Sequence, residues 1–158
     1  STCLWSNEIK PNMAQRRSPA RVAYYRAYGN DSEQVAHMVW DVMLSWAKKN
    51  HLDSDRCRLY MYNHGFSRVK KYWHEIMITL EDPFTFQDHL VQEKIFTGGK
   101  YLTYDTNLHQ LVASWQKVIQ HVSANKIAGG RHQWVEEWKL ENWSFPEKGI
   151  TIFYPRAD

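Results

Sequence analysis

The sequence has few of the residues that build metal sites, disulfide frameworks or membrane spans. Its 158 residues include only two cysteines and no Cys-x-x-Cys pair. This argues against a disulfide scaffold or a thiolate metal site and fits a reducing compartment. No apolar run approaches the roughly 20 residues that cross a bilayer, and no signal-peptide pattern opens the chain. We therefore expect one cytoplasmic domain, residues 1–158, that needs no cofactor and contacts no membrane.

The net charge is also small, and common catalytic motifs are missing from the sequence. Lys and Arg number 20 against 17 Asp and Glu, and this slight excess does not predict nucleic-acid binding. The sequence holds no phosphate-binding Gly-x-x-x-x-Gly-Lys frame and no Gly-x-Ser-x-Gly nucleophile elbow. Its eight histidines show no helical ligand spacing. We predict no catalytic residue and no metal site.

Aromatic residues, in contrast, are abundant. They make up 15% of the chain, with 8 Trp, 9 Tyr and 6 Phe. Such rings can fill a bulky core, or they can line a pocket that takes a flat or cationic ligand. Composition alone leaves both interpretations open.

Two helices and six strand-like segments recur in one order. Residues 31–50 have a capping pair, Asp31 and Gln34, followed by an apolar stripe of helical period, and residues 107–125 repeat such a stripe. Segments rich in β-branched and aromatic residues precede and follow each helix: 21–28, 57–63 and 72–80 around the first, and 100–104, 132–142 and 149–154 around the second. The order strand–helix–strand–strand therefore occurs twice.

This order predicts an α+β fold. The two copies, at about 18–80 and 93–156 with a connection at 81–92, form a tandem pseudo-twofold repeat. We expect one antiparallel sheet with both main helices on one face and a pocket near the pseudo-twofold axis. Leu4–Lys10 can add an edge strand, and Pro11–Pro19 is interpreted as a loop.

One carboxylate falls on an apolar strand face. Alternation along residues 133–142 groups Glu136 with Trp134, Trp138 and Leu140, while Val135, Glu137, Lys139 and Glu141 are expected to face water. A buried carboxylate must be paired or becomes neutral. Glu136 is therefore paired inside the protein, offers counter-charge to a ligand between indole rings, or acts as a catalytic acid or base. A one-residue slip would bury Glu137 instead.

Other aromatic side chains are candidates for the core or for a pocket wall. Trp40, Trp46 and Trp115 lie on apolar helical stripes, which favour core positions. Tyr60, Tyr62, Tyr24 and Tyr104 lie on or beside strands, and their hydroxyls need partners if buried. These tyrosines are therefore interpreted as possible pocket walls.

The order of several short motifs resembles a known family. The carriers are 21–29, the helix residues Trp40, Trp46 and Trp115, Gly98-Gly99-Lys100-Tyr101-Leu102, Val135-Glu136-Glu137-Trp138 and 150–155. Together they resemble the GyrI-like small-molecule-binding domains, found also as effector-binding domains of AraC-type and multidrug-sensing transcription regulators. The resemblance covers about 18–156. Trp138 replaces a family Tyr, Asp105-Thr106-Asn107 stands where a Gly is common, and the loop at 63–67 differs, so ligand identity stays open.

The resemblance implies a tandem-repeat fold with an aromatic pocket in which Glu136 meets a hydrophobic, aromatic, cationic small molecule. The expected ligand-binding residues are Glu136, Trp134, Trp138, Trp40, Tyr104 and Tyr60. The resemblance further implies a bacterial effector-sensing domain linked to transcription through a fused or recruited DNA-binding domain, without nucleic-acid binding of its own. Its alternatives are a hydrolase of reactive natural products that uses Glu136, and a gyrase-inhibitor-like protein-binding module.

Overall fold

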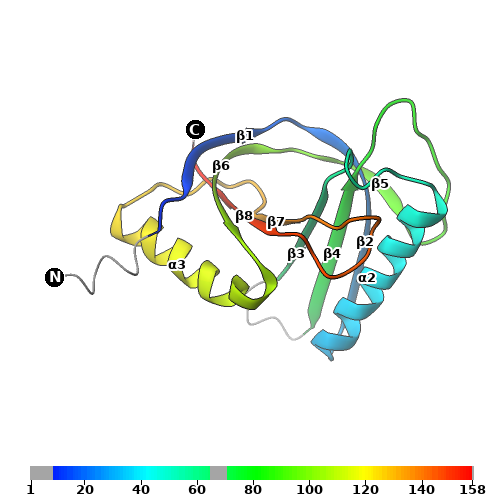
Figure 1. Cartoon of the computed structure of the whole chain (residues 1–158), viewed down its shortest axis with the longest axis horizontal. Helices are drawn as coiled ribbons and strands as arrows, with labels where there is room; N and C mark the ends of the chain where they lie inside the picture. The colour runs from blue at the N-terminus through cyan, green and yellow to red at the C-terminus, as the bar shows by residue number, and fades with distance from the viewer. Residues whose placement is uncertain (1–8, 65–70, 158) are drawn as a thin grey trace.

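Eight antiparallel strands form one sheet in the computed structural model, which describes residues 9–64 and 71–157 (Figure 1). Across the sheet their order is β1-β6-β8-β7-β3-β4-β2-β5. The strands are β1 (Asn12–Arg17), β2 (Ala20–Gly29), β3 (Leu59–Asn63), β4 (Tyr72–Thr79), β5 (Gln92–Phe96), β6 (Gly99–Thr106), β7 (Val135–Trp138) and β8 (Ile150–Pro155).

Side-chain caps start the two helical segments, as the sequence predicts. Helix α2 (Ser32–Lys49) begins where the Asp31 carboxylate accepts a hydrogen bond from the Gln34 amide at 3.2 Å. A short 3₁₀ turn, η1 (Leu108–Gln110), has the Asn107 side chain as its cap and leads into α3 (Leu111–Ala124). Each cap satisfies an amide that the first helical turn leaves without a partner.

The tandem repeat is confirmed, with one more leading strand in each unit (β1 and β5) than the predicted strand–helix–strand–strand order. The first unit is β1–β4 with α2, and the second is β5–β8 with α3. Strands β1, β2, β3 and β4 correspond to β5, β6, β7 and β8. When each strand is exchanged for its counterpart, the sheet order is the same read in reverse, so a pseudo-twofold axis between β3 and β7 relates the two units. The leading strand of each unit pairs with the other unit, β1 with β6 and β5 with β2.

Both helices cover one face of the sheet, as predicted. Leu59 and Ile76 pack with α2 residues, and Ile152 packs with Val118 of α3. The register places Met61, Glu136 and Ile152 in one row across β3, β7 and β8, on this same helix-covered face. Figure 1 shows α2 beside β2 and α3 beside β6, with β3 and β7 between them.

Within β7 the opposite face is also buried, so the expectation that it faces water was wrong for Val135 and Glu137, whereas Lys139 and Glu141 beyond the strand are exposed as expected. Val135 is fully buried and Glu137 is only 5% exposed. The sheet coils on itself: Phe96 of β5 lies 5.0 Å from Tyr60 of β3 between ring centroids, although three strand spacings of a flat sheet would separate these strands by about 14 Å. The coiled sheet thereby encloses a second core.

The N-terminal prediction was also wrong where it can be compared. Residues 12–17, expected to lie in a loop, form β1, and Ile9 and Lys10 lie in no strand. The rest of the expected edge strand at Leu4–Lys10 falls outside the described residues. Pairing with β6 supplies the backbone partners that the polar β1 sequence does not itself signal. Within the described chain, neither main helix is long and apolar enough to cross a membrane.

Candidate functional site

A cavity of about 540 Å³ opens beside the central strands. It lies where the ends of β3 and β8, strand β7, helix α3 and the segment before β7 converge. The lining residues are Asn63, His64, Trp115, Ile119, Gly130, His132, Trp134, Glu136, Tyr154 and Pro155. Its volume falls within the range of roughly 300–1,000 Å³ that is usual for small-molecule sites.

Glu136 is the buried acid of this cavity, with 4% of its surface exposed. Its carboxylate accepts two indole hydrogen bonds. Trp115 Nε1 donates to Oε2 at 2.6 Å, and Trp138 Nε1 donates to Oε1 at 3.0 Å. No Lys or Arg in the described part of the chain forms an ion pair with it. Two neutral donors therefore orient the carboxylate without neutralising its charge.

The protonation of Glu136 reflects two opposing influences. Burial raises the pKa of Glu136, because the charged form loses its hydration. The hydrogen bonds from Trp115 and Trp138 stabilise the charged form and lower the pKa. Burial dominates, so the pKa lies above its ordinary value. A cation placed in the cavity would restore the lost stabilisation of the charge.

The tryptophans around Glu136 divide into two groups. Trp115 and Trp134 line the cavity and meet edge to face, with ring centroids 5.1 Å apart. Trp138 is 8% exposed and packs instead against Trp40 of α2 at 4.9 Å. Trp40 also contacts Phe145 at 5.4 Å and is not among the residues that line the cavity. The structure thus places Trp134 and Glu136 at the cavity and Trp138 and Trp40 behind the carboxylate.

Tyr60 and Tyr104, the two tyrosines among the expected ligand-binding residues, lie elsewhere. Tyr60 is opposite Glu137 in the β3–β7 register, so its side chain leaves the opposite face of the sheet and packs between Phe96 and Phe153. Tyr104 lies on the helix-covered face within the apolar cluster under α3, and it does not line the cavity. Neither tyrosine reaches the cavity that contains Glu136.

Trp115 is the cavity residue whose role the sequence obscured. A helical stripe predicts which face of a helix is apolar, but it does not show how deeply each residue is buried. In α3 only Ser114 and Val118 are buried, so Trp115 lies at the margin of the helix–sheet contact and borders the cavity. His64, His132 and Tyr154 also line it, and none of the three is among the expected ligand-binding residues.

His64 directly follows β3, and His74 lies in the neighbouring strand β4. The Tyr72 ring lies between them, 4.8 Å from the His64 ring and 6.0 Å from the His74 ring. Burial lowers the pKa of His74 to about 4, which keeps it neutral. In the described ranges, no cluster of three or more His, Cys, Asp or Glu side chains could hold a metal ion.

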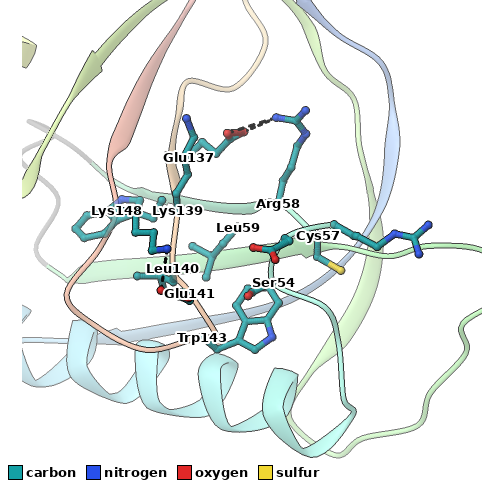
Figure 2. A pocket seen from close by; sticks show the side chains of 13 residues that line it. Ser54, Cys57, Arg58, Leu59, Glu137, Lys139, Leu140, Glu141, Trp143 and Lys148 are labelled. Carbon is teal, nitrogen blue, oxygen red and sulfur yellow. Dashed lines mark hydrogen bonds and ion pairs between the residues drawn. The ribbon is translucent and has the colours of Figure 1, made fainter.

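A second cavity, of about 350 Å³, lies at the other end of β7 (Figure 2). Two of its acids are paired with cations of the same lining. Figure 2 shows Glu137 directed at Arg58, with a separation of 2.9 Å, and Glu141 beside Lys148 at 2.7 Å. Burial also raises the pKa of its Cys57 thiol, which makes the reactive thiolate scarce. The buried acid of this cavity, Glu137, is thus paired, whereas no Lys or Arg that the structure describes pairs with Glu136.

Comparison with known proteins finds likeness in structure and not in sequence. No family model matches the chain, and no curated protein matches it. The crystal structure of the EcmrR C-terminal domain superimposes with a TM-score of 0.72 at 12% identity, covering 95% of this chain and 99% of that one. The chain has the fold of the EcmrR C-terminal domain. This agrees with the fold implied by the resemblance to GyrI-like domains.

Other structures share the EcmrR-type fold. SAV2435 bound to tetraphenylphosphonium matches with a TM-score of 0.62 at 9% identity, covering 94% of each chain. A protein described as a hydrolase from Listeria innocua matches at 0.56 and 10% identity, covering 99% of this chain and 96% of that one. EcmrR in its complex with DNA matches at 0.70 and 12% identity over 92% of this chain, which spans 56% of that protein. At these identities the likeness concerns the fold.

Proposed function

We propose that this domain binds hydrophobic, aromatic monocations in the Glu136 cavity and that binding regulates a transcription factor to which it is fused or recruited. The observation that carries the proposal is a buried carboxylate beside a cavity of about 540 Å³, held by two indoles and without a cationic partner among residues 9–64 and 71–157. A ligand cation would compensate this charge in a low-dielectric setting. Trp115 and Trp134 offer aromatic faces and edges for cation–π and stacking contacts.

Two of the structural relatives support the two halves of this proposal. SAV2435 is bound to tetraphenylphosphonium, a bulky lipophilic cation. EcmrR is seen in complex with DNA, and its C-terminal domain is the part that this chain resembles. Both relatives support the proposal that the chain senses drug-like cations and that the response is read out in transcription.

Titration with tetraphenylphosphonium tests binding directly. We expect saturable quenching of intrinsic fluorescence, because Trp115 and Trp134 line the cavity. Tetraphenylborate is the matched control, since it has nearly the same shape and the opposite charge. It should bind far more weakly, because the cavity acid would repel it. Absence of saturable quenching, or equal affinity for both ions, would contradict the proposal.

We propose binding without catalysis, although one observation favours hydrolysis. A carboxyl group of raised pKa at a cavity can act as a general base. Both oxygens of Glu136 already accept indole hydrogen bonds, which suits a fixed counter-charge. Incubation with styrene oxide, a simple reactive electrophile, separates the two functions. Formation of more than one equivalent of diol, lost in Glu136→Gln, would establish hydrolysis in place of simple binding.

The pH dependence of binding should report the ionisation of Glu136. The ionised form attracts the cation, so affinity should be full above the raised pKa and fall as the pH decreases through it. This window lies above the ordinary glutamate value of 4.5. Trp115→Phe removes a hydrogen bond to the charged form, so it should move the midpoint of binding to still higher pH.

Dissociation constants for tetraphenylphosphonium measured across this pH range provide the check. Trp46→Phe is the control, because Trp46 packs against Phe84 and Phe86 away from the cavity. Its profile should match that of the wild type. A midpoint that stays in place or moves to lower pH in Trp115→Phe would refute the role given to this hydrogen bond.

A further inference from the structure

The imidazole of His132 sits in a slot between two glycines. A Cβ built on Gly99 would lie 2.6 Å from ring atom Cδ2, and one built on Gly130 would lie 2.5 Å from Cε1. The ring also meets Tyr101 edge to face at 4.9 Å. No other residue type at either glycine leaves room for this ring without a shift. The two glycines thus fix the place of an imidazole in the cavity wall.

Its tautomer follows from one contact. His132 Nε2 lies 2.7 Å from the carbonyl oxygen of Lys100. A carbonyl oxygen only accepts, so Nε2 carries the proton and donates it. In the neutral ring, Nδ1 then holds a lone pair. No described donor reaches Nδ1.

The acceptor Nδ1 lies beside Gly130, a residue of the cavity wall. A Cβ on Gly130 would come within 2.7 Å of Nδ1, so the absence of a side chain there leaves this atom uncovered. Both Gly130 and His132 line the same cavity as Glu136. The imidazole of His64 also lines it, but no described contact fixes which of its nitrogens carries the proton. Among the described residues of this cavity, His132 offers an acceptor whose tautomer its contact with Lys100 defines, together with the acid Glu136.

We propose that His132 Nδ1 makes this site selective for cations that carry N–H groups, such as protonated amines and amidinium ions. The inference rests on the proposed function, because Glu136 supplies the counter-charge. A cation with an N–H group satisfies both sites: its charge faces Glu136, and its N–H donates to Nδ1. A quaternary cation of the same size offers charge alone and leaves Nδ1 without a donor.

Two flat tricyclic monocations test this selectivity. 9-Aminoacridinium carries N–H donors, and 10-methylacridinium carries none. We expect the wild type to bind 9-aminoacridinium about tenfold more tightly, the effect of one hydrogen bond between a charged donor and a neutral acceptor. His132→Phe keeps a planar ring in the glycine slot and removes the acceptor. It should bring the two dissociation constants within about twofold by weakening only 9-aminoacridinium.

Controls separate this inference from the proposed function. His37→Phe changes an exposed histidine of α2 and should preserve the preference. Gly130→Ala would displace the ring or cover Nδ1, so it should lose the preference; its Cβ would also lie 2.5 Å from the carbonyl oxygen of Arg156, so a thermal melt must first show that the variant is folded. Glu136→Gln should weaken both probes alike. The inference is overturned, while cation binding stands, if the wild type does not prefer 9-aminoacridinium. It is also overturned if this preference persists in both His132→Phe and Gly130→Ala. Failure of both probes to bind overturns the proposed function as well.

Discussion

Glu136→Gln is expected to weaken tetraphenylphosphonium binding by roughly 30-fold or more at neutral pH, the effect of removing one partner from a buried charge pair. The carboxylate is 4% exposed, so little water screens its attraction to a cation. Glutamine also fits the indoles badly. Its carbonyl oxygen can accept from Trp115 or Trp138, but its amide group then faces the other indole N–H, and two donors oppose each other.

Glu137→Gln is the matched control for this result. Glu137 is the next residue of β7 and is equally buried, but its side chain leaves the opposite face and pairs with Arg58 at 2.9 Å and Arg17 at 3.4 Å. Its substitution should lower stability and leave the dissociation constant unchanged. Isothermal titration calorimetry measures the dissociation constant of tetraphenylphosphonium for each of the two variants. Equal losses of affinity in the two variants would show that the effect of Glu136 is not local to the cavity.

Trp46→Ala should lower the free energy of unfolding by about 3–5 kcal/mol, as expected when a large buried aromatic ring is removed. Trp46 is 5% exposed on the inner face of α2 and packs edge to face against Phe86 at 4.9 Å and Phe84 at 6.1 Å. The segment that carries these two phenylalanines should lose its main contact with the helix. Because Trp46 is remote from the cavity, affinity for tetraphenylphosphonium should not change.

Urea denaturation measures this loss of stability. Met38→Ala is the control on the same helix, since Met38 is 43% exposed and its truncation should cost no more than about 0.5 kcal/mol. If Trp46→Ala lowers the free energy of unfolding by less than about 1 kcal/mol, Trp46 contributes little to the stability of the core. A parallel loss of affinity would mean that the aromatic core and the cavity are not independent.

The helices and inner strands could be predicted because their signals are local. Asp31 caps α2 and an apolar stripe follows, and both features lie within one stretch of sequence. Strand β1 could not be predicted in this way. Its sequence, Asn-Met-Ala-Gln-Arg-Arg, lacks alternation, and it becomes a strand through its pairing with the distant β6. Burial of Glu137 likewise depends on the coiling of the whole sheet.

The residues of the candidate site also differ in whether local sequence or long-range pairing determines their position. Alternation within β7 was enough to place Glu136 on the helix-covered face, where the structure buries it. The position of Tyr60 depends on its register with β7, which no single strand encodes, and this register puts Tyr60 opposite Glu137. The only sequence feature that relates to the placement of His132 is indirect. The pairs Gly98-Gly99 and Gly129-Gly130 look like chain breakers, whereas Gly99 and Gly130 make room for its ring.

The exchange of leading strands between the two units has a consequence for how the molecule unfolds. Three strand pairings cross from one unit to the other: β1 with β6, β5 with β2, and β3 with β7. If the first unit opened, β5, β6 and β7 of the second unit would each lose a strand partner. If the second unit opened, β1, β2 and β3 would lose theirs. The backbone groups along those strand edges would be left unpaired. The two halves therefore unfold as a single cooperative block. A ligand held at Glu136, on a strand of this shared seam, stabilises both halves at once.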